Sequence, residues 1–413
     1  MNPVLPATPV PDFRSPAFLR RHIADTMAFY HPRSIDPAGG FFQYFKDDGA
    51  IYERSHRHLV SSTRFVFNNA MAALEFADDA PLAAQYREAA QHGLRYLREV
   101  HRNPHTGGYA WTIRDGAPED TTYHAYGVAF VLLAYACGRR LGVTEAPAWM
   151  DETWALLEQH YWDAQAGLYR DEADEYWRFS DYRGQNANMH MCEAMIAAWQ
   201  ASGESRYLDR ALTLADHMTR RQAALADGLV WEHYDARWQI DWNYNKDNPK
   251  HLFRPWGFQP GHQTEWAKLL MILDRELHAA SRAVPDWLLP TARHLFDTAV
   301  KHAWDDAHGG LCYGFAPDGQ VCDDDKYFWV QAESLTAAAL LHARTGDPVY
   351  AGWHDKLWAY AWRHFVDHEY GAWYRILTVD NRKYSDEKSP AGKVDYHTMG
   401  ACHELLALYR RRA

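Results

Sequence analysis

A short turn signature recurs six times along the chain and limits its fold more than any other feature. Each copy places a glycine shortly after an Asp or Asn and shortly before an apolar residue. The copies occupy residues 36–42, 103–109, 163–169, 226–229, 305–311 and 367–373. Their glycines lie roughly 60 to 80 residues apart, which leaves room for two helices and a loop in each interval.

Apolar residues recur at helical spacing within every interval. The first helix of each pair is expected at 18–30, 82–100, 154–161, 207–218, 287–304 and 350–365, with a helix-start signal, most often a proline, before it. The second helix is expected at 61–77, 121–141, 185–201, 259–283, 326–345 and 396–411. These second helices are richer in small residues, as in Ala337–Ala339, which suits a crowded position near an axis.

Six helix pairs predict an all-α fold, an (α/α)6 barrel in which the second helices form the inner ring. We expect one domain over residues 1–413, with 1–14 as an irregular N-terminal segment. A linear array of helix pairs is the alternative, but such arrays have no converging polar centre.

Unusual polar residues fall on the second helix of every pair. At i,i+4 spacing are Asn186 with His190 and Trp329 with Glu333; at i,i+3 spacing are His262 with Glu265 and His190 with Glu193. Each pair therefore lies on one helix face. A lone histidine on a helix is more often a core or surface group, but candidates on six helices of one class predict a shared axial pocket. The full set is Arg64, Tyr126, Asn186, His190, His262, Glu265, Trp329, Glu333 and His397.

The two His-x-x-Glu pairs also permit a metal site, because histidine and carboxylate are common ligands. Di-iron bundles, however, use the reverse order, Glu-x-x-His, and no Cys/His cluster completes a zinc site. We therefore expect neither a metal nor a cofactor.

Charge and composition exclude several partners. The formal net charge is -11, and no run of Lys or Arg reaches the length of a nucleic-acid patch. The five cysteines have no CxxC spacing and are odd in number, which favours a reducing compartment. The N-terminus lacks a signal-peptide pattern, and no window is apolar enough to span a membrane. We expect a soluble, cytoplasmic monomer or homodimer.

Six segments in order carry a resemblance to a known family. They are Ser61–Phe65, Tyr126–Phe130, Asn186–Ala194, Arg254–Gly257 with Pro260–Trp266, Phe328–Glu333 and Lys393–His397. Through them the chain resembles the N-acylglucosamine 2-epimerase superfamily over nearly its whole length. One departure is Phe328, since many relatives have two successive tryptophans there.

The resemblance implies an (α/α)6 barrel that binds a monosaccharide without a metal. It implies that His262 and His397 are the acid/base pair, that His190 is a supporting or ring-opening group, and that Arg64 is the cation near the reacting oxygens. It further implies that the sugar is held by Tyr126, Asn186, Trp329 and Glu333.

Sugar chemistry at C2 suits these residue types. A histidine near its ordinary pKa of ~6.5 can take and return the weakly acidic C2 proton at neutral pH. A fixed cation such as Arg64 stabilises the enediolate oxygens. We expect Glu265 to orient His262 and keep it basic.

Segments 386–393 and 12–16 most resemble the mannose-isomerising members of the family. The expected reaction is therefore the interconversion of D-mannose and D-fructose. A mannose/glucose 2-epimerase is the first alternative. A glycoside hydrolase that uses Glu265 and Glu333 as its two carboxylates is the second, and a sugar-binding protein without catalysis is the third.

Overall fold

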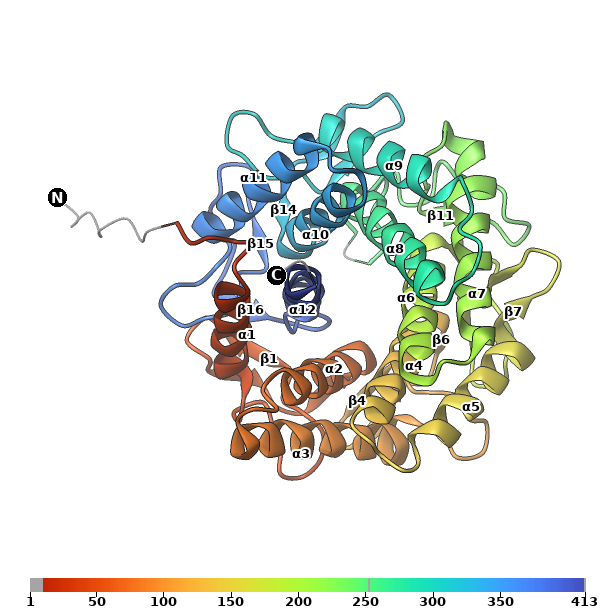
Figure 1. Cartoon of the computed structure of the whole chain (residues 1–413). Coiled ribbons are helices and arrows are strands. Elements are labelled where there is room, and N and C mark those ends of the chain that lie inside the picture. Colours follow the sequence, from red (N-terminus) through yellow and green to blue (C-terminus); the bar gives the residue numbers. More distant parts are fainter. Residues whose placement is uncertain (1–9, 252, 412–413) are drawn as a thin grey trace.

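Twelve α-helices form six hairpins that close into a ring in the computed structural model, which describes residues 10–251 and 253–411 (Figure 1). The outer helices are α1 (Pro16–Tyr30), α3 (Ala80–Tyr96), α5 (Ala146–Leu156), α7 (Ser205–Asp216), α9 (Leu288–Ala303) and α11 (Pro348–His364). The inner helices are α2 (Leu59–Glu75), α4 (Ala125–Arg140), α6 (Gln185–Ser202), α8 (Pro260–Ala279), α10 (Phe328–Thr345) and α12 (Tyr396–Arg410). The predicted (α/α)6 barrel and its inner ring are confirmed.

Several outer helices end in tighter or wider turns than the sequence predicts. π-Helical turns extend α3, α5 and α7, and a 3₁₀ turn follows the last of them: η1 (Leu97–His101), η2 (Leu157–Tyr161), η3 (His217–Gln222) and η4 (Ala223–Ala226). Capping side chains fix helix starts, since Ser15, Asp79 and Asp347 each accept an N–H from the first turn of the helix that follows. Of the predicted irregular segment, residues 1–9 lie outside the described residues, and a turn directly precedes Ser15.

The repeated turn is an Asx turn closed by a glycine. At Asp305 the carboxylate accepts the N–H of Ala307 at 2.9 Å, and the backbone carbonyl accepts the N–H of Gly309 at 2.8 Å. Gly309 has a φ of 76°, a conformation that glycine adopts without steric cost. The fourth copy differs because Asp227 itself is left-handed, with a φ of 54°, at the end of η4.

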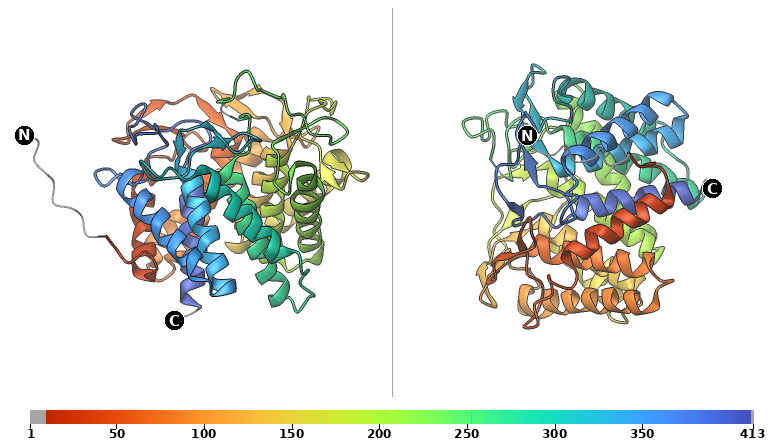
Figure 2. Two further views of the ribbon diagram at one scale, coloured as in Figure 1. Left: turned by 90° about the horizontal axis from the view of Figure 1, so that it is seen from above. Right: turned by 90° about the vertical axis from the view of Figure 1, so that its left-hand side faces the viewer.

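Short antiparallel strands and the longer loops gather at the end of the barrel where the inner helices begin (Figure 2). They make two three-stranded sheets, β16-β1-β2 and β3-β4-β5, and the pairs β6-β9, β7-β8, β10-β11, β12-β13 and β14-β15. Their bounds are β1 (Tyr44–Lys46), β2 (Ile51–Glu53), β3 (His56–His58), β4 (Thr112–Arg114), β5 (Ala117–Asp120), β6 (Tyr123–His124), β7 (Trp162–Asp163), β8 (Leu168–Tyr169), β9 (Glu172–Ala173), β10 (Arg183–Gly184), β11 (His233–Tyr234), β12 (Gly314–Phe315), β13 (Val321–Asp323), β14 (Lys326–Tyr327), β15 (Ile376–Leu377) and β16 (Glu387–Ser389).

Buried side-chain amides attach three inner helices to the repeated turns. Asn188 on α6 binds both the N–H and the carbonyl of Tyr169, at 2.8 and 3.0 Å. Gln263 on α8 binds Val230 in the same two-pronged way, and Gln331 on α10 binds Leu311. Because each amide lies within two residues of a predicted site residue, these contacts fix how the first turns of the inner helices face the axis.

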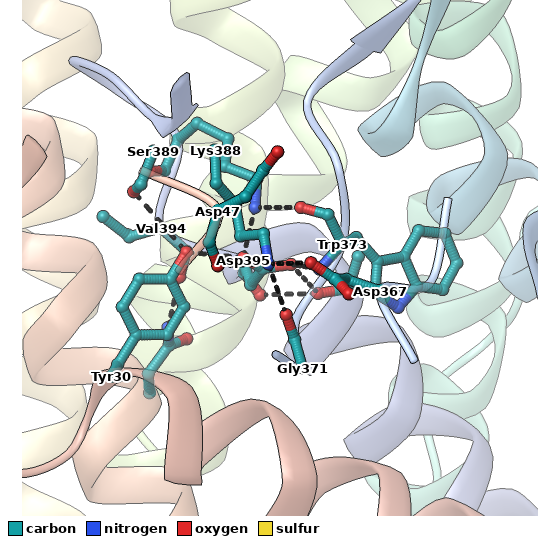
Figure 3. A network of polar contacts seen from close by, with 12 residues as sticks. Tyr30, Asp47, Asp367, Gly371, Trp373, Lys388, Ser389, Val394 and Asp395 are labelled. Carbon is teal, nitrogen blue, oxygen red and sulfur yellow. Dashed lines mark hydrogen bonds and ion pairs between the residues drawn. The ribbon is translucent and has the colours of Figure 1, made fainter. Parts of the chain in front are cut away.

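In the sixth repeat a buried ion pair replaces the amide (Figure 3). Asp395 Oδ1 accepts the N–H of Trp373 at 3.1 Å, and Lys393 Nζ donates to the carbonyl of Trp373 at 2.6 Å, while the two side chains pair with each other. Tyr30 Oη donates to Asp395 Oδ2 at 2.6 Å and ties α1 to the start of α12. Lys388 binds the sixth turn itself through Asp367 Oδ2, also at 2.6 Å.

Among the described residues, no helix combines the length and the apolar character that crossing a membrane requires.

Candidate active site

A pocket of about 120 Å³ opens at the strand-bearing end of the ring, around the first turns of the inner helices. Eight of the nine predicted site residues line it, and the ninth, Glu333, lies behind His397. The rest of the lining comes from residues to which the sequence analysis gave no site role, which are His58, Val60, Phe253, Pro255, Tyr313, Tyr327, Phe328, Arg375, Ala391, Gly392 and Lys393.

His397 on α12 presents a bare nitrogen to this pocket. Its Nδ1 lies 2.6 Å from Glu333 Oε1, and its Nε2 lies 3.3 Å from Nη2 of Arg64. Because a guanidinium can only donate, Nε2 must accept, and the ring proton is therefore on Nδ1. Burial lowers the pKa of His397 well below its usual value, and the positive charges of Arg64 and Lys268 act in the same direction. The ring is thus a neutral imidazole poised to accept a proton.

His262 on α8 also points Nδ1 away from the pocket, toward a different glutamate. Nδ1 lies 3.0 Å from both carboxylate oxygens of Glu232, which stands directly before β11. Glu232 also accepts an N–H from the Gln185 amide at 3.0 Å, and the Gln185 oxygen accepts the indole N–H of Trp266 at 2.8 Å. Glu232 contacts no lysine or arginine in the part of the chain that the structure describes.

The prediction that Glu265 orients His262 is wrong, because Glu232 occupies that position. The i,i+3 spacing does bring Glu265 to the axis, but its carboxyl group lies 3.7 Å from Nζ of Lys268 on the same helix and 3.9 Å from Nδ1 of His190 on α6. Burial raises the pKa of Glu265 well above its usual value, and the charge of Glu333 adds to the rise. Glu265 therefore takes up a proton more readily than a free glutamate does, although the charges of Lys268 and Arg64 oppose this rise in its pKa.

The prediction that Glu333 holds the sugar is also wrong. Its Oε1 accepts from His397, and its Oε2 lies 2.6 Å from the ammonium of Lys268, so both oxygens are engaged below the pocket. The i,i+4 spacing from Trp329 places Glu333 one helical turn deeper than the pocket floor. Trp329 itself stands beside both histidines, with ring centroids 5.0 Å from His262 and 5.6 Å from His397.

His190 on α6 is the third histidine of the pocket. Its Nδ1 contacts Glu193 Oε2 at 3.1 Å, as the i,i+3 spacing predicts. Burial lowers the pKa of His190 to about 4, although the Glu193 carboxylate opposes that fall. Its ring packs edge-on against Tyr126 with centroids 5.1 Å apart and lies 6.1 Å from the ring of His397.

Arg64 on α2 is held rigidly at the pocket wall. Its guanidinium donates to the carbonyl of Gly392 at 2.6 Å and to Tyr126 Oη at 3.1 Å. It also lies between the rings of Phe130 and Tyr396, 4.5 and 4.9 Å from their centroids. The cation predicted near the reacting oxygens therefore has a fixed orientation.

Several polar atoms on the pocket wall have no hydrogen-bond partner in the described part of the chain. They include Asn186 Oδ1, Arg64 Nε and both oxygens of Glu265. Buried polar groups are nearly always hydrogen-bonded, so such a cluster calls for a polar ligand. A ligand with several hydroxyl groups and an apolar face for Trp329 fits this wall.

The loop before α8 contributes Phe253 and Pro255 to the pocket lining, a contact that the sequence did not predict. The loop runs from Asp241 to Gly257, apart from residue 252, and its Phe253 side chain lines the pocket while remaining half exposed. Lys250 fastens one part through Asp323 and Asp325 at 3.2 and 3.1 Å. Turn-rich loops have no periodicity that would have placed them at the pocket.

Lys268 on α8 stands among the carboxylates beneath the histidines. Its Nζ lies 2.6 Å from Glu333, 3.2 Å from Glu193 and 3.7 Å from Glu265. Within residues 10–251 and 253–411, two groups at this level bring His and Glu ligand atoms within 4.8 Å of one another, namely His190 with Glu193 and Glu265, and Glu265 with Glu333 and His397. Lys268 contacts every one of these three glutamates, so its ammonium already supplies a positive charge to their carboxyl groups.

Comparisons with known proteins agree with this geometry. Residues 40–401 match the N-acylglucosamine 2-epimerase (GlcNAc 2-epimerase) family. A D-mannose isomerase from Marinomonas mediterranea is 55% identical over 398 residues, 96% of this chain and 98% of that protein. The crystal structure of a D-mannose isomerase superposes with a TM-score of 0.93 at 55% identity, covering 96% of this chain and 99% of that chain. The cellobiose 2-epimerase from Spirochaeta thermophila, at 22% identity and a TM-score of 0.81 over 97% of this chain and all of that chain, shares the fold.

Proposed function

The chain belongs to the N-acylglucosamine 2-epimerase family, and we propose that it is an aldose–ketose isomerase that interconverts D-mannose and D-fructose. One observation carries the proposal. Two histidines face one sugar-sized pocket with Nε2 while a glutamate holds each Nδ1, and an arginine lies beside one of them. The 55% identity to a D-mannose isomerase over nearly the full length of both chains supports the choice of sugar.

We assign proton transfer at carbon to His397. As the sugar oxygens take over the hydrogen bond from Arg64, the released Nε2 lone pair takes the C2 proton of open-chain mannose, and the C2–H electrons form the C1–C2 double bond of an enediolate. The positive charge of Arg64, 3.3 Å from that nitrogen, stabilises the oxyanion. His397 then returns the proton to C1 on the same face, which produces fructose. One neutral base suffices, because C1 and C2 are adjacent in the planar intermediate.

We assign the oxygen protons to His262. As C2 is deprotonated, the aldehyde O1 gains a proton, and the O2 hydroxyl later loses one to become the ketone. A histidine beside an uncompensated carboxylate suits this work, since Glu232 stabilises the positive charge that the ring carries before it protonates O1 and again after it takes the proton from O2. Glu265, Asn186 and Tyr126 hold sugar hydroxyls, Trp329 packs on the apolar face, and His190 assists ring opening.

A 2-epimerase on the same frame would deliver a proton to the opposite face of C2 from His262 and release glucose. A glycoside hydrolase would need two carboxyl groups on either side of a bond. The pair considered from the sequence, Glu265 and Glu333, does not meet this need, because Glu333 is bound to His397 and Lys268 below the pocket.

We further propose that the chain acts as one catalytic domain, as a cytoplasmic monomer or homodimer, without a metal ion and without nucleic acid. The pocket draws residues from all six hairpins, which supports a single catalytic unit. All five cysteines are free thiols, and four of them are buried, as suits a reducing compartment.

The decisive experiment is incubation with D-mannose in D₂O, followed by ¹H and ¹³C NMR of the products. Fructose that carries deuterium at C1, formed before any glucose, is the expected result. Glucose formed first would identify a 2-epimerase instead. Absence of any turnover of mannose would reject both assignments.

A further inference from the structure

Lys268 is a buried lysine whose side chain none of the steps above uses. It stands on α8 in an apolar run, Trp266-Ala267-Lys268-Leu269-Leu270, yet its ammonium reaches the axis beneath the pocket. Burial alone would lower the pKa of Lys268, but the surrounding glutamates Glu193, Glu333 and Glu265 raise it well above its usual value. Lys268 is therefore a permanent buried cation.

The Lys268 ammonium contacts the two glutamates that hold the Nδ1 atoms of His397 and His190. Glu333 contacts both Lys268, at 2.6 Å, and His397 Nδ1, also at 2.6 Å. Glu193 contacts Lys268 at 3.2 Å and His190 Nδ1 at 3.1 Å. A single carboxylate therefore separates the Lys268 ammonium from each of two of the three pocket histidines.

We propose that Lys268 is a positioning residue of the isomerase, because it keeps Glu333 ionised so that Glu333 accepts the Nδ1 proton of His397 and leaves Nε2 bare toward the sugar. The reaction named here rests on the proposed function. The protonation site on His397, however, can be measured without any sugar.

The charges around His397 explain why Lys268 is needed. Facing this ring or its glutamate are Arg64 from α2, His190 and Glu193 from α6, Glu265 and Lys268 from α8, and Glu333 from α10. Burial raises the pKa of Glu333, and the Lys268 ammonium works against that rise. Without the ammonium, three buried carboxyl groups would share no cation of their own, so the cluster would take up a proton.

The extra proton can bind either Glu333 or His397, and in both cases Nε2 of His397 becomes protonated. If it binds Glu333, the new O–H donates to Nδ1 of His397, and the ring proton moves to Nε2. If it binds His397 directly, the ring becomes an imidazolium with a proton on Nε2. Either way the lone pair that takes the C2 proton is lost until the pH is high enough to remove the extra proton.

Lys268→Met keeps the side-chain volume and removes the charge. At pH 7 we expect kcat to fall about 10- to 100-fold with little change in KM, the size typical of losing a group that orients a reacting one. The acidic limb of the kcat profile should move to higher pH, so that the deficit shrinks in alkaline buffer. Lys268→Arg should restore the profile. A Lys268→Met profile with its acidic limb unmoved would overturn the proposal.

The substrate-free measurement is ¹⁵N NMR of the His397 ring. We expect an unprotonated Nε2 in the wild-type protein and in Lys268→Arg, and a protonated Nε2 in Lys268→Met at the same pH. The same protonation site in all three proteins would reject the proposal, whichever sugar the enzyme acts on. If the wild-type protein failed to turn over mannose, the proposed function would fall and this result would still stand.

Lys268 also lines a second cavity, which makes chemical rescue possible. This cavity has a volume of about 550 Å³ at the end of the barrel opposite the sugar pocket, and Glu193, Glu333 and His397 also line it. Methylammonium should therefore reach the space left in Lys268→Ala and restore part of kcat. Methanol at the same concentration should not, and equal recovery with methanol would show that volume rather than charge matters, against the proposal.

Lys326→Met is the matched control. Lys326 is as buried as Lys268 and pairs with Asp305 at 2.8 Å, but it does not line the pocket. We expect a lower melting temperature and an unmoved acidic limb; a shift equal to that of Lys268→Met would mean that any buried lysine has this effect. If Lys268→Met does not fold, Glu193→Gln/Lys268→Met removes one uncompensated acid; because Glu333 still lacks its ammonium, we expect a smaller shift in the same direction, and an unmoved acidic limb would count against the proposal.

Discussion

His262 and His397 enter the pocket from different helices with the same local arrangement, a glutamate at Nδ1 and Nε2 toward the axis, yet their surroundings differ by one residue further out. Behind the glutamate of His397 stands a lysine, whereas behind that of His262 stands the amide of Gln185. Arg64 adds a second positive charge on the His397 side. A histidine–glutamate pair therefore does not define a role by itself, because the next group outward decides whether the ring stays neutral or can carry a charge.

The largest expected effect comes from removing each ring in turn. His397→Asn should lower kcat about 10⁴-fold, the upper end of what general acid/base groups contribute. It should also abolish exchange of the C2 hydrogen of mannose in D₂O. His262→Asn should lower fructose formation about 10²- to 10³-fold and retain measurable C2 exchange, since the base remains. NMR of both products checks the pair, and C2 exchange lost only in His262→Asn would reverse the assigned roles.

The two glutamates should respond unequally to the same substitution. In Glu333→Gln the amide oxygen must face the ammonium of Lys268, so the amide nitrogen donates to Nδ1 and forces the ring proton onto Nε2. We expect about a 10³- to 10⁴-fold loss of kcat, approaching the loss known for a histidine held in the wrong tautomer. In Glu232→Gln the amide oxygen can still accept from both His262 and Gln185, so only the charge is lost and the decrease should be about tenfold. Steady-state kinetics of the two variants tests this. Equal losses of kcat would mean that the glutamates of His397 and His262 do not differ in role.

The dependence of kcat/KM on pH should reflect the positive charges around His397. Burial and the charge of Arg64 lower the pKa of His397, so the base stays unprotonated when the pH falls below 6.5. The acidic limb of kcat/KM is therefore expected below pH 6.5, and it should move upward in Arg64→Gln as one positive charge disappears. Initial rates at each pH check this, with melting temperature recorded in parallel. An acidic limb above pH 6.5 in the wild-type enzyme would contradict a neutral His397.

The melting temperature itself should fall in acid. His190 has a pKa of about 4 in the folded protein, below the usual value of about 6.5 that it regains on unfolding. Between these values the unfolded chain binds more protons, so stability decreases as the pH drops from 6.5 toward 4. Calorimetry should show this decrease reduced in His190→Gln. An unchanged slope in that variant would mean that other buried groups account for it.

The smallest expected effect is that of a chelator. Lys268 already contacts the three glutamates that could otherwise bind a cation, so EDTA should leave the rate of mannose turnover unchanged. Turnover that falls with EDTA and returns with a divalent metal would overturn the metal-free proposal and would make the Lys268 side a metal site.

The sequence predicted the ring because its information is local and repeated. An Asx turn with a left-handed glycine, followed by helical periodicity, needs no knowledge of distant residues. The same local rules brought His190, His262, His397 and Arg64 to one pocket. They failed for Glu232, which contacts His262 from a loop 30 residues earlier in the chain. They also failed for Glu333: its helix face was predicted correctly, but it lies one turn below the pocket, where it contacts His397.

Lys268 shows where a signal existed and was missed. A single lysine in an apolar helix run, three residues after Glu265, is energetically improbable unless buried acids surround it. The loop carrying Phe253 had no such signal, because its place at the pocket depends on long-range contacts such as that of Lys250 with Asp323.

The closure of the ring has a consequence for synthesis of the protein. Arg64 and His397 are 333 residues apart in the chain yet meet at 3.3 Å, and Tyr30 binds Asp395 across a similar span. A ribosome that has delivered five hairpins has not yet made Arg375, Ala391, Gly392, Lys393 and His397, so the pocket is incomplete and lacks the histidine to which we assign proton abstraction. A nascent chain stays catalytically silent until its last helix docks, so no partly made enzyme can consume the cell's sugar.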